Sequence, residues 1–213
     1  MELIDAINYV SSKLSVIEGV KTDIILSEPC NSSDIDELEN KFKIEFSKQL
    51  KDIYLNHTST IKFSWNIDDN LFGLNCKRGC VNLLSPKEII KKFDDMISIV
   101  EEGTINYDEL AENEGLKALV EDWPNWIPIS KFPNGDYFCI DKDKYENPMI
   151  FLEHDVMDGG PNVHGLKIAL NFDDLVYKWS KVGFVDIYDW TNGINSYGIN
   201  FNSEVFEKLI SVL

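Results

Sequence analysis

The sequence predicts an α+β fold: one domain with a mostly antiparallel sheet of about five or six strands and helices packed against one face. The first observation is Asn134-Gly135 between two apolar runs, because both residues tolerate the positive φ of a tight hairpin turn. The second is strict apolar/polar alternation over 61–67, which predicts a half-buried strand. The third is helical spacing of apolar residues over 2–18 and 172–182. A length of 213 residues without internal repeats fits one domain.

The residue pattern in the first quarter of the chain predicts three helices. The N-terminal helix over 2–18 carries its apolar residues on one face, and residues 20–26 form a short strand or an extended linker. Ser32 or Ser33 is expected to cap the second helix, whose first turn is acidic and therefore suits the positive end of the helix dipole. A third helix is expected over about 47–56, with its apolar residues on one side.

Two strands and a long helix are expected next. The alternating strand over 61–67 ends at an acidic turn, after which residues 71–74 can pair back and residues 81–84 form another short strand. A helix over about 85–101 begins with a Ser cap, a Pro at its first position and a Glu three residues after the cap. Residues 104–122 are also expected to be helical, but acidic, with only a thin apolar stripe.

The second half predicts the centre of the sheet and its closing helix. Short strands are expected near 126–130, 136–141 and 148–153, a last strand or lead-in near 166–170, and a helix over 172–182 that buries Phe172, Leu175, Val176 and Trp179. We expect a single domain (1–213), and a resemblance to a known family, given below with its motifs, implies that residues 30–182 are its core, with the helix 2–18 before it. A C-terminal extension over 184–213 ends in a short helix.

The formal net charge of −17 restricts the class of partner. Binding to nucleic acids or anionic membranes depends on Lys and Arg, so direct contact with either is not expected. The acid is concentrated: residues 101–122 contain eight acidic residues and one Lys, and residues 136–158 contain seven acidic residues and two Lys. Each segment is either a solvated surface or a contact surface for a basic partner.

The sequence supports no catalytic residue, metal or cofactor. No Gly-rich phosphate loop and no Gly-x-Ser-x-Gly elbow is present. Cys76 and Cys80 lack a second ligand pair for zinc, and Cys139 is expected to be a buried, inert thiol. The only concentration of His is His154-Asp155 with His164, where a metal site would need further converging ligands.

Aromatic residues beside carboxylates suggest where a basic partner would bind. Trp65 and Trp190 each lie near acidic loops, and a Trp surrounded by carboxylates suits an interface, although a partly buried Trp is the simpler interpretation for either one. The candidate partner-binding residues are Trp65, Asp68, Asp69, Glu109, Glu112, Glu114, Asp155, Asp158, Asp189 and Trp190.

Four motifs resemble the SUKH superfamily, which includes yeast cell-wall-synthesis regulators and many bacterial immunity proteins. They are Trp-Pro-x-Trp-Ile-Pro-Ile over 123–129, Asn-Gly-Asp-Tyr-x-Cys-Ile-Asp over 134–141, an apolar strand ending at 153–155, and the helix from Asn171 to Trp179. The chain departs from the family pattern in two places. Ser47 stands where Pro is usual, and residues 57–59 replace an Asn-Gly turn.

The resemblance implies a non-catalytic immunity protein that binds and neutralises a cognate toxin, which we expect to be a basic nuclease. The alternatives are an intracellular scaffold similar to the yeast regulators and, less favoured, a metal-dependent hydrolase using His154, Asp155 and His164. No apolar run approaches the roughly 20 residues of a membrane span, and the N-terminus is acidic where a signal peptide is basic. We therefore expect a cytoplasmic protein.

Overall fold

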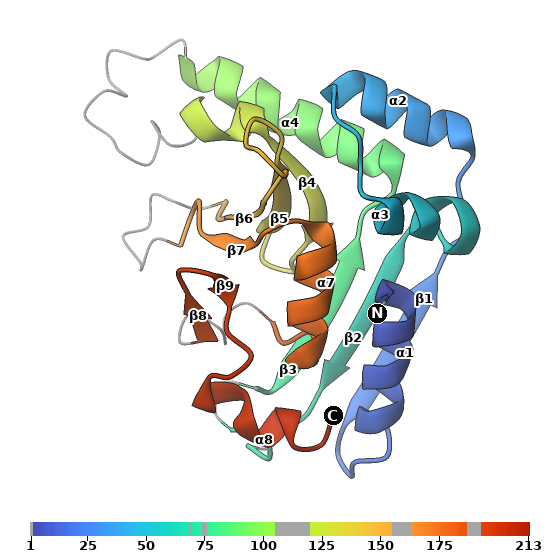
Figure 1. Ribbon diagram of the computed structural model, residues 1–213, viewed down its shortest axis with the longest axis vertical. Coiled ribbons are helices and arrows are strands. Elements are labelled where there is room, and N and C mark those ends of the chain that lie inside the picture. Colours follow the sequence, from blue (N-terminus) through green and yellow to red (C-terminus); the bar gives the residue numbers. More distant parts are fainter. Residues whose placement is uncertain (1, 69, 74–75, 105–119, 155–162, 187–192) are drawn as a thin grey trace.

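Seven antiparallel strands form one sheet in which each strand pairs with the next one along the chain (Figure 1). A computed structural model describes residues 2–68, 70–73, 76–104, 120–154, 163–186 and 193–213. The strands are β1 (Lys21–Leu26), β2 (Ile61–Asn66), β3 (Arg78–Leu83), β4 (Trp126–Lys131), β5 (Tyr137–Asp141), β6 (Met149–Leu152) and β7 (Lys167–Ala169). The expected α+β class is confirmed, and the sheet has seven strands where about five or six were expected.

The helices pack against this sheet and against one another. Helix α4 contacts β4, α2 contacts α4, and α1 contacts α7. Their bounds are α1 (Leu3–Leu14), α2 (Ser32–Phe42), α3 (Lys48–Asp52), α4 (Pro86–Thr104), α7 (Phe172–Lys181) and α8 (Glu207–Ile210). A small second sheet pairs β8 (Ile194–Asn195) with β9 (Gly198–Ile199).

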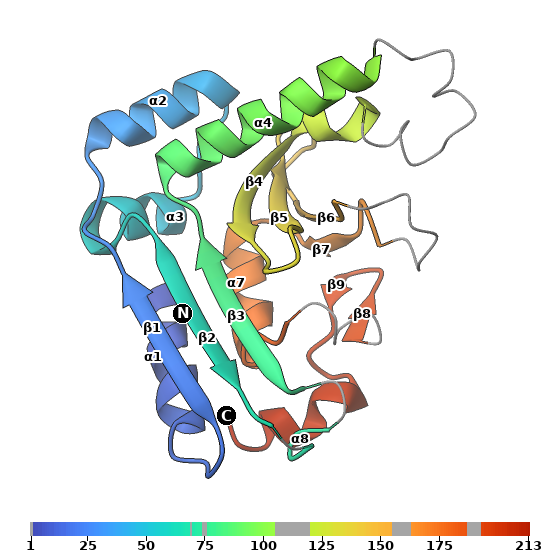
Figure 2. The ribbon, with the colours of Figure 1, turned by 180° about the vertical axis from the view of Figure 1, so that it is seen from behind.

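Strands β1 to β3 have one covered and one open face. In β2, Ile61, Phe63 and Trp65 are buried while the residues between them are exposed, as the alternation predicted. Helices α1 and α7 lie on the covered face, and Figure 2 shows the other face with no described helix over it. Within the segment 20–26, Lys21–Leu26 forms the edge strand β1, so this segment is a strand rather than a linker.

The two halves of the sheet join through little backbone pairing. Strands β3 and β4 share one ladder pair, Leu83 with Ser130. Two further hydrogen bonds support it: the Leu84 N–H donates to the Ile129 carbonyl at 3.0 Å, and the Ser130 hydroxyl donates to the Asn82 carbonyl at 3.1 Å. The side chains packed across this junction must therefore supply most of the cohesion between the halves.

The hairpin expected at Asn134-Gly135 joins β4 to β5. Gly135 has a φ of 104°, a left-handed conformation that Gly adopts without steric cost. The Phe132 N–H donates to the Asp136 carbonyl at 2.8 Å, and the Gly135 N–H donates back to the Phe132 carbonyl at 3.1 Å. The turn thereby sets the register that places both Phe132 and Phe138 in the core.

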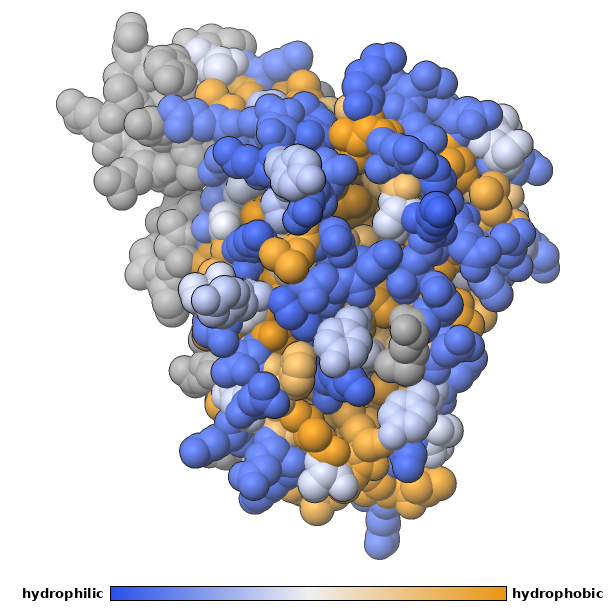
Figure 3. Space-filling view, in the orientation of Figure 1, coloured by the Kyte–Doolittle hydropathy of each residue, from blue (hydrophilic) through white to orange (hydrophobic). Residues whose placement is uncertain are grey.

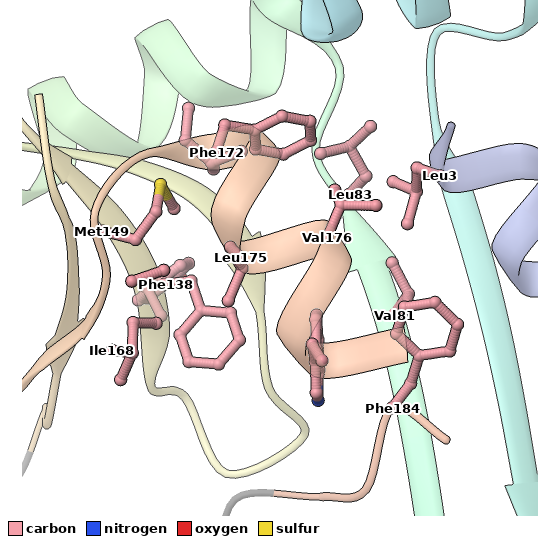
Figure 4. Packing of buried hydrophobic residues seen from close by; sticks show 14 of the residues in the cluster. Leu3, Val81, Leu83, Phe138, Met149, Ile168, Phe172, Leu175, Val176 and Phe184 are labelled. Carbon is pink, nitrogen blue, oxygen red and sulfur yellow. The ribbon is translucent and has the colours of Figure 1, made fainter. Parts of the chain in front are cut away.

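Helix α7 fills the junction between the two halves. Figure 4 shows Leu175 directed towards Phe138 and Met149, and Val176 directed towards Leu83. Trp179 is buried, stands edge-on to Phe138 with ring centroids 4.8 Å apart, and donates its indole N–H to the Val185 carbonyl at 3.0 Å. All four apolar residues predicted to be buried on this helix are buried.

The local sequence signals identified most helices correctly, but the cap of α2 and the end of the third helix differ from the prediction. Ser85 and Glu88 form the expected reciprocal cap of α4, with the Ser85 N–H donating to the Glu88 carboxylate at 2.8 Å. Helix α2 is capped by Asn31 rather than by Ser32 or Ser33, and the Asn31 N–H donates to the Asp34 carboxylate at 3.2 Å. The third helix changes from α3 into a π-helical turn over Ile53–His57.

Three other expectations concern residues 71–74, the acidic segment 104–122 and the chain end. Residues 71–73 form a turn and do not pair back as a strand, whereas residue 74 lies outside the described part. The acidic helix expected over 104–122 falls mostly on residues 105–119, which also lie outside it. The short C-terminal helix is present as α8, preceded by a single 3₁₀ turn.

Replacing Trp179 with Ala is expected to lower the free energy of unfolding by about 3–5 kcal/mol, because it leaves a large cavity between the two halves of the sheet. Urea denaturation followed by circular dichroism measures this change. Lys181→Ala, an exposed position on the same helix, is the control and should change stability by less than about 0.5 kcal/mol. Equal losses for the two variants would show that Trp179 does not hold the junction.

Candidate partner-binding surface

Two of the ten candidate partner-binding residues, Trp65 and Asp68, lie in the described part of the chain. The other eight lie outside the described residues: Asp69, Glu109, Glu112, Glu114, Asp155, Asp158, Asp189 and Trp190. For these eight the assignment stays a prediction.

Trp65 is a core residue, and its assignment as a surface anchor is wrong. Its side chain is 1% exposed, stands edge-on to Phe72, and donates its indole N–H to the Gly183 carbonyl at 2.5 Å. A Cβ on Gly79 would approach the Trp65 indole nitrogen to 2.2 Å, so only Gly leaves room for this ring. The alternation of β2 already placed Trp65 on the inward face, whereas the acidic turn after it had suggested a surface position.

Asp68 is exposed, as a contact residue must be. It follows directly after Ile67, whose N–H donates to the Lys77 carbonyl at 2.9 Å and so holds the end of this strand against β3. Asp68 therefore lies just beyond the end of β2, with its side chain exposed to solvent. Its role in binding remains a prediction.

The described residues just before and just after segment 105–119 include several acidic side chains. Glu101 and Glu102 are exposed at the C-terminal end of α4, and Glu121 is exposed where the chain returns. The pKa of Asp122 is raised by burial and by the neighbouring charges of Glu121 and Asp141. The smaller part of this shift, which comes from Glu121 and Asp141, is consistent with a locally negative surface that would attract a basic partner.

The two histidines near the end of β6 have structural partners. The Asp136 carboxylate, 4% exposed, accepts from the His154 backbone N–H at 3.0 Å and lies 2.7 Å from the His154 ring Nδ1. This carboxylate therefore ties the hairpin after β4 to the end of β6. An Asp–His pair of this kind orients a ring, but catalysis would also need a nucleophile or substrate site beside it.

His164 is buried and neutral at physiological pH. Its ring packs on Trp126 with centroids 4.8 Å apart, and its side chain is 3% exposed. Burial lowers the pKa of this imidazole from 6.5 to about 4. The ring Nε2 lies 3.9 Å from an Asp122 carboxylate oxygen, beyond hydrogen-bonding distance.

The described residues contain no arrangement typical of a metal centre or a nucleophilic thiol. No group of three or more His, Cys, Asp and Glu side chains in this part of the chain could hold a metal ion. Burial raises the pKa of the Cys80 thiol to about 12 and that of Cys139 well above its ordinary value. Both thiols stay protonated at neutral pH and are poor nucleophiles.

Within the described ranges, no helix has the length and apolar character needed to cross a lipid bilayer.

The family model for the SMI1/KNR4 family (SUKH-1) matches residues 29–178. The matched stretch begins just before α2 and ends within α7, so it contains six of the seven strands of the main sheet and leaves out β1. No curated protein matches the chain.

Acidification is expected to destabilise the protein through His164. Because the folded-state pKa of about 4 lies below the ordinary 6.5, the unfolded chain binds the proton more readily, and stability falls as the pH drops through that window. Between about pH 7 and pH 5 this group should cost roughly 2 kcal/mol of unfolding free energy.

The contribution of His164 can be separated from that of the carboxylates. His164→Phe keeps an aromatic ring against Trp126 and should remove that part of the pH dependence, as measured by urea denaturation at both pH values. An unchanged pH slope in His164→Phe would contradict the assignment.

Proposed function

The chain belongs to the SMI1/KNR4 family (SUKH-1), and from this premise we propose that it is a non-catalytic immunity protein that binds and neutralises a bacterial toxin domain. SUKH proteins are mostly immunity proteins. The match over residues 29–178 is the observation that carries the proposal. In this role the protein works in the cytoplasm and uses neither a cofactor nor direct contact with nucleic acid.

The charge of the protein supports a basic toxin, for which a nuclease is the best candidate. A nuclease holds phosphates with Lys and Arg, so its active-site surface is positive. A partner with a net charge of −17 would be attracted to that surface and would compete with nucleic acid for it. Long-range attraction also speeds encounter, which favours rapid neutralisation of a toxin.

The chemistry of the described residues supports binding rather than turnover. Asp136 uses its carboxylate to fasten the end of β6, His164 is buried and neutral, and the thiols of Cys80 and Cys139 are protonated. Within the part of the chain that the structure describes, Asp136 and His164 thus serve the fold, and these two thiols are poor nucleophiles. The exposed charge remains available for recognition.

Co-expression with the toxin domain encoded beside its gene tests the proposal directly. The protein should protect cells from that toxin and form a complex that survives gel filtration, with a dissociation constant on the order of 1 nM. Loss of protection together with loss of the complex would refute the proposal. Recovery of several signalling proteins instead of one toxin would favour the scaffold alternative.

Association with the toxin should depend steeply on salt. Raising ionic strength from about 50 mM to about 500 mM shortens the Debye length several-fold, so the association rate constant should fall by about tenfold or more while dissociation changes little. Stopped-flow fluorescence measures both rates. Glu101→Lys with Glu102→Lys should reduce the salt dependence, and a salt-independent association rate would contradict electrostatic steering.

A further inference from the structure

A hollow of about 280 Å³ lies where three separate segments meet. The connection between α2 and α3 supplies one wall, the turn between β5 and β6 supplies another, and the N-terminal end of α7 supplies the third. In Figure 3, hydrophobic atoms are visible in a recess among hydrophilic side chains near that end of α7. The volume is slightly below the roughly 300 Å³ at which pockets for drug-sized ligands begin, so it suits one long side chain.

The hollow combines an apolar floor with an acidic rim. Phe46, Ile140 and Phe172 line it, and all three are at least nine-tenths buried. The charged residues in the lining are Glu45, Glu146 and Asp173, and no basic residue is among them. An apolar stem that ends in a positive charge matches this combination, which is the chemistry of Arg and Lys.

Two of the three carboxylates are available to a ligand. Glu45 is already paired with Lys51 at 2.9 Å. Glu146 and Asp173 are exposed, and neither makes an ion pair with any residue that the structure describes. Two free carboxylates favour Arg over Lys, because the planar guanidinium presents several donors at once.

The backbone of Glu146 adopts a conformation that is unusual for a Glu residue. Its φ of 66° lies in the left-handed region, which costs a non-Gly residue roughly 1–2 kcal/mol. Gly or Asn would adopt this conformation more easily. The adjacent Tyr145 is 91% exposed, and exposed aromatic side chains are enriched in protein interfaces.

An anion is the competing occupant, because the N-terminus of a helix favours negative charge. Here Asn171 already caps α7 by accepting from the Asp174 N–H at 2.9 Å, and the Asp174 carboxylate accepts from the Leu170 N–H at 2.8 Å. The carboxylates of Glu146 and Asp173 would also repel an anion from the hollow. The lining therefore favours a cation.

We propose that this hollow receives an arginine side chain of the partner protein, with the stem on Phe46 and Phe172 and the guanidinium between Glu146 and Asp173. The role as an anchor for the partner rests on the proposed function. The affinity of the hollow for a blocked arginine is independent of the proposed function, because that affinity depends on the hollow alone.

Titration of the ¹⁵N-labelled protein with N-acetyl-L-arginine methylamide, followed by NMR, tests the site. Saturable shifts are expected at the amides of 44–47, 145–147 and 171–173, with a dissociation constant on the order of 1 mM. The neutral analogue N-acetyl-L-citrulline methylamide should bind at least about tenfold more weakly. Equal binding of the two compounds, absence of saturable shifts, or stronger binding of inorganic phosphate would overturn the proposal.

Matched variants separate binding from folding. Glu146→Asn with Asp173→Asn should weaken arginine binding by about tenfold or more while retaining the thermal midpoint, because Asn tolerates the left-handed φ at position 146. Glu204→Gln with Glu207→Gln removes two exposed charges near α8 and should leave binding unchanged. Equal affinities in these two double variants would exclude the hollow as the arginine site.

The two proposals fail in different ways. If the blocked arginine binds but no toxin complex forms, the site stands and the proposed function falls. If the toxin binds Glu146→Asn/Asp173→Asn as tightly as it binds the wild-type protein, the hollow is not an anchor for the partner and that role is refuted.

Discussion

The packing of α7 between the two halves of the sheet is the interaction on which the rest of the structure depends. Strands β3 and β4 share a single ladder pair, so backbone bonding alone joins the halves weakly. Leu175 and Val176 point to opposite sides of the junction (Figure 4), and the buried ring of Trp179 packs edge-on against Phe138. The same helix begins at Phe172, after its cap Asn171, beside the acidic hollow, so the element that closes the core also positions one wall of that hollow.

In this arrangement the buried polar groups stabilise the fold, whereas the exposed charged groups form the surface. Buried polar groups serve the fold: the carboxylate of Asp136 holds the end of β6, and the indoles of Trp65 and Trp179 bond to backbone carbonyls. Exposed acidic groups such as Glu101, Glu121 and Glu146 lie at connections and helix ends. A framework of this kind suits a protein that recognises a partner by charge and shape without transforming it, in keeping with its SUKH family membership.

The sequence predicted those features whose causes are local. The Asn134-Gly135 hairpin, the cap of α4 and the buried face of α7 follow from turn preference, capping and periodicity. The alternation of β2 indicates that Trp65 faces inward, but its hydrogen-bond partner, the Gly183 carbonyl, lies 118 positions further along the chain, where no local pattern reveals it. The π-turn closed by the Thr58 N–H on the Ile53 carbonyl, and the hollow formed by three distant segments, likewise depend on tertiary packing.

Hydrogen–deuterium exchange of the free protein and of its complex with the toxin domain is the most direct test of an inert framework with an acidic binding surface. The account predicts slower exchange in acidic surface segments, including 44–47 and 145–147, with core amides of β3, β4 and α7 unchanged. Faster exchange in the core on binding, or protection confined to the open face of β1 to β3, would contradict it.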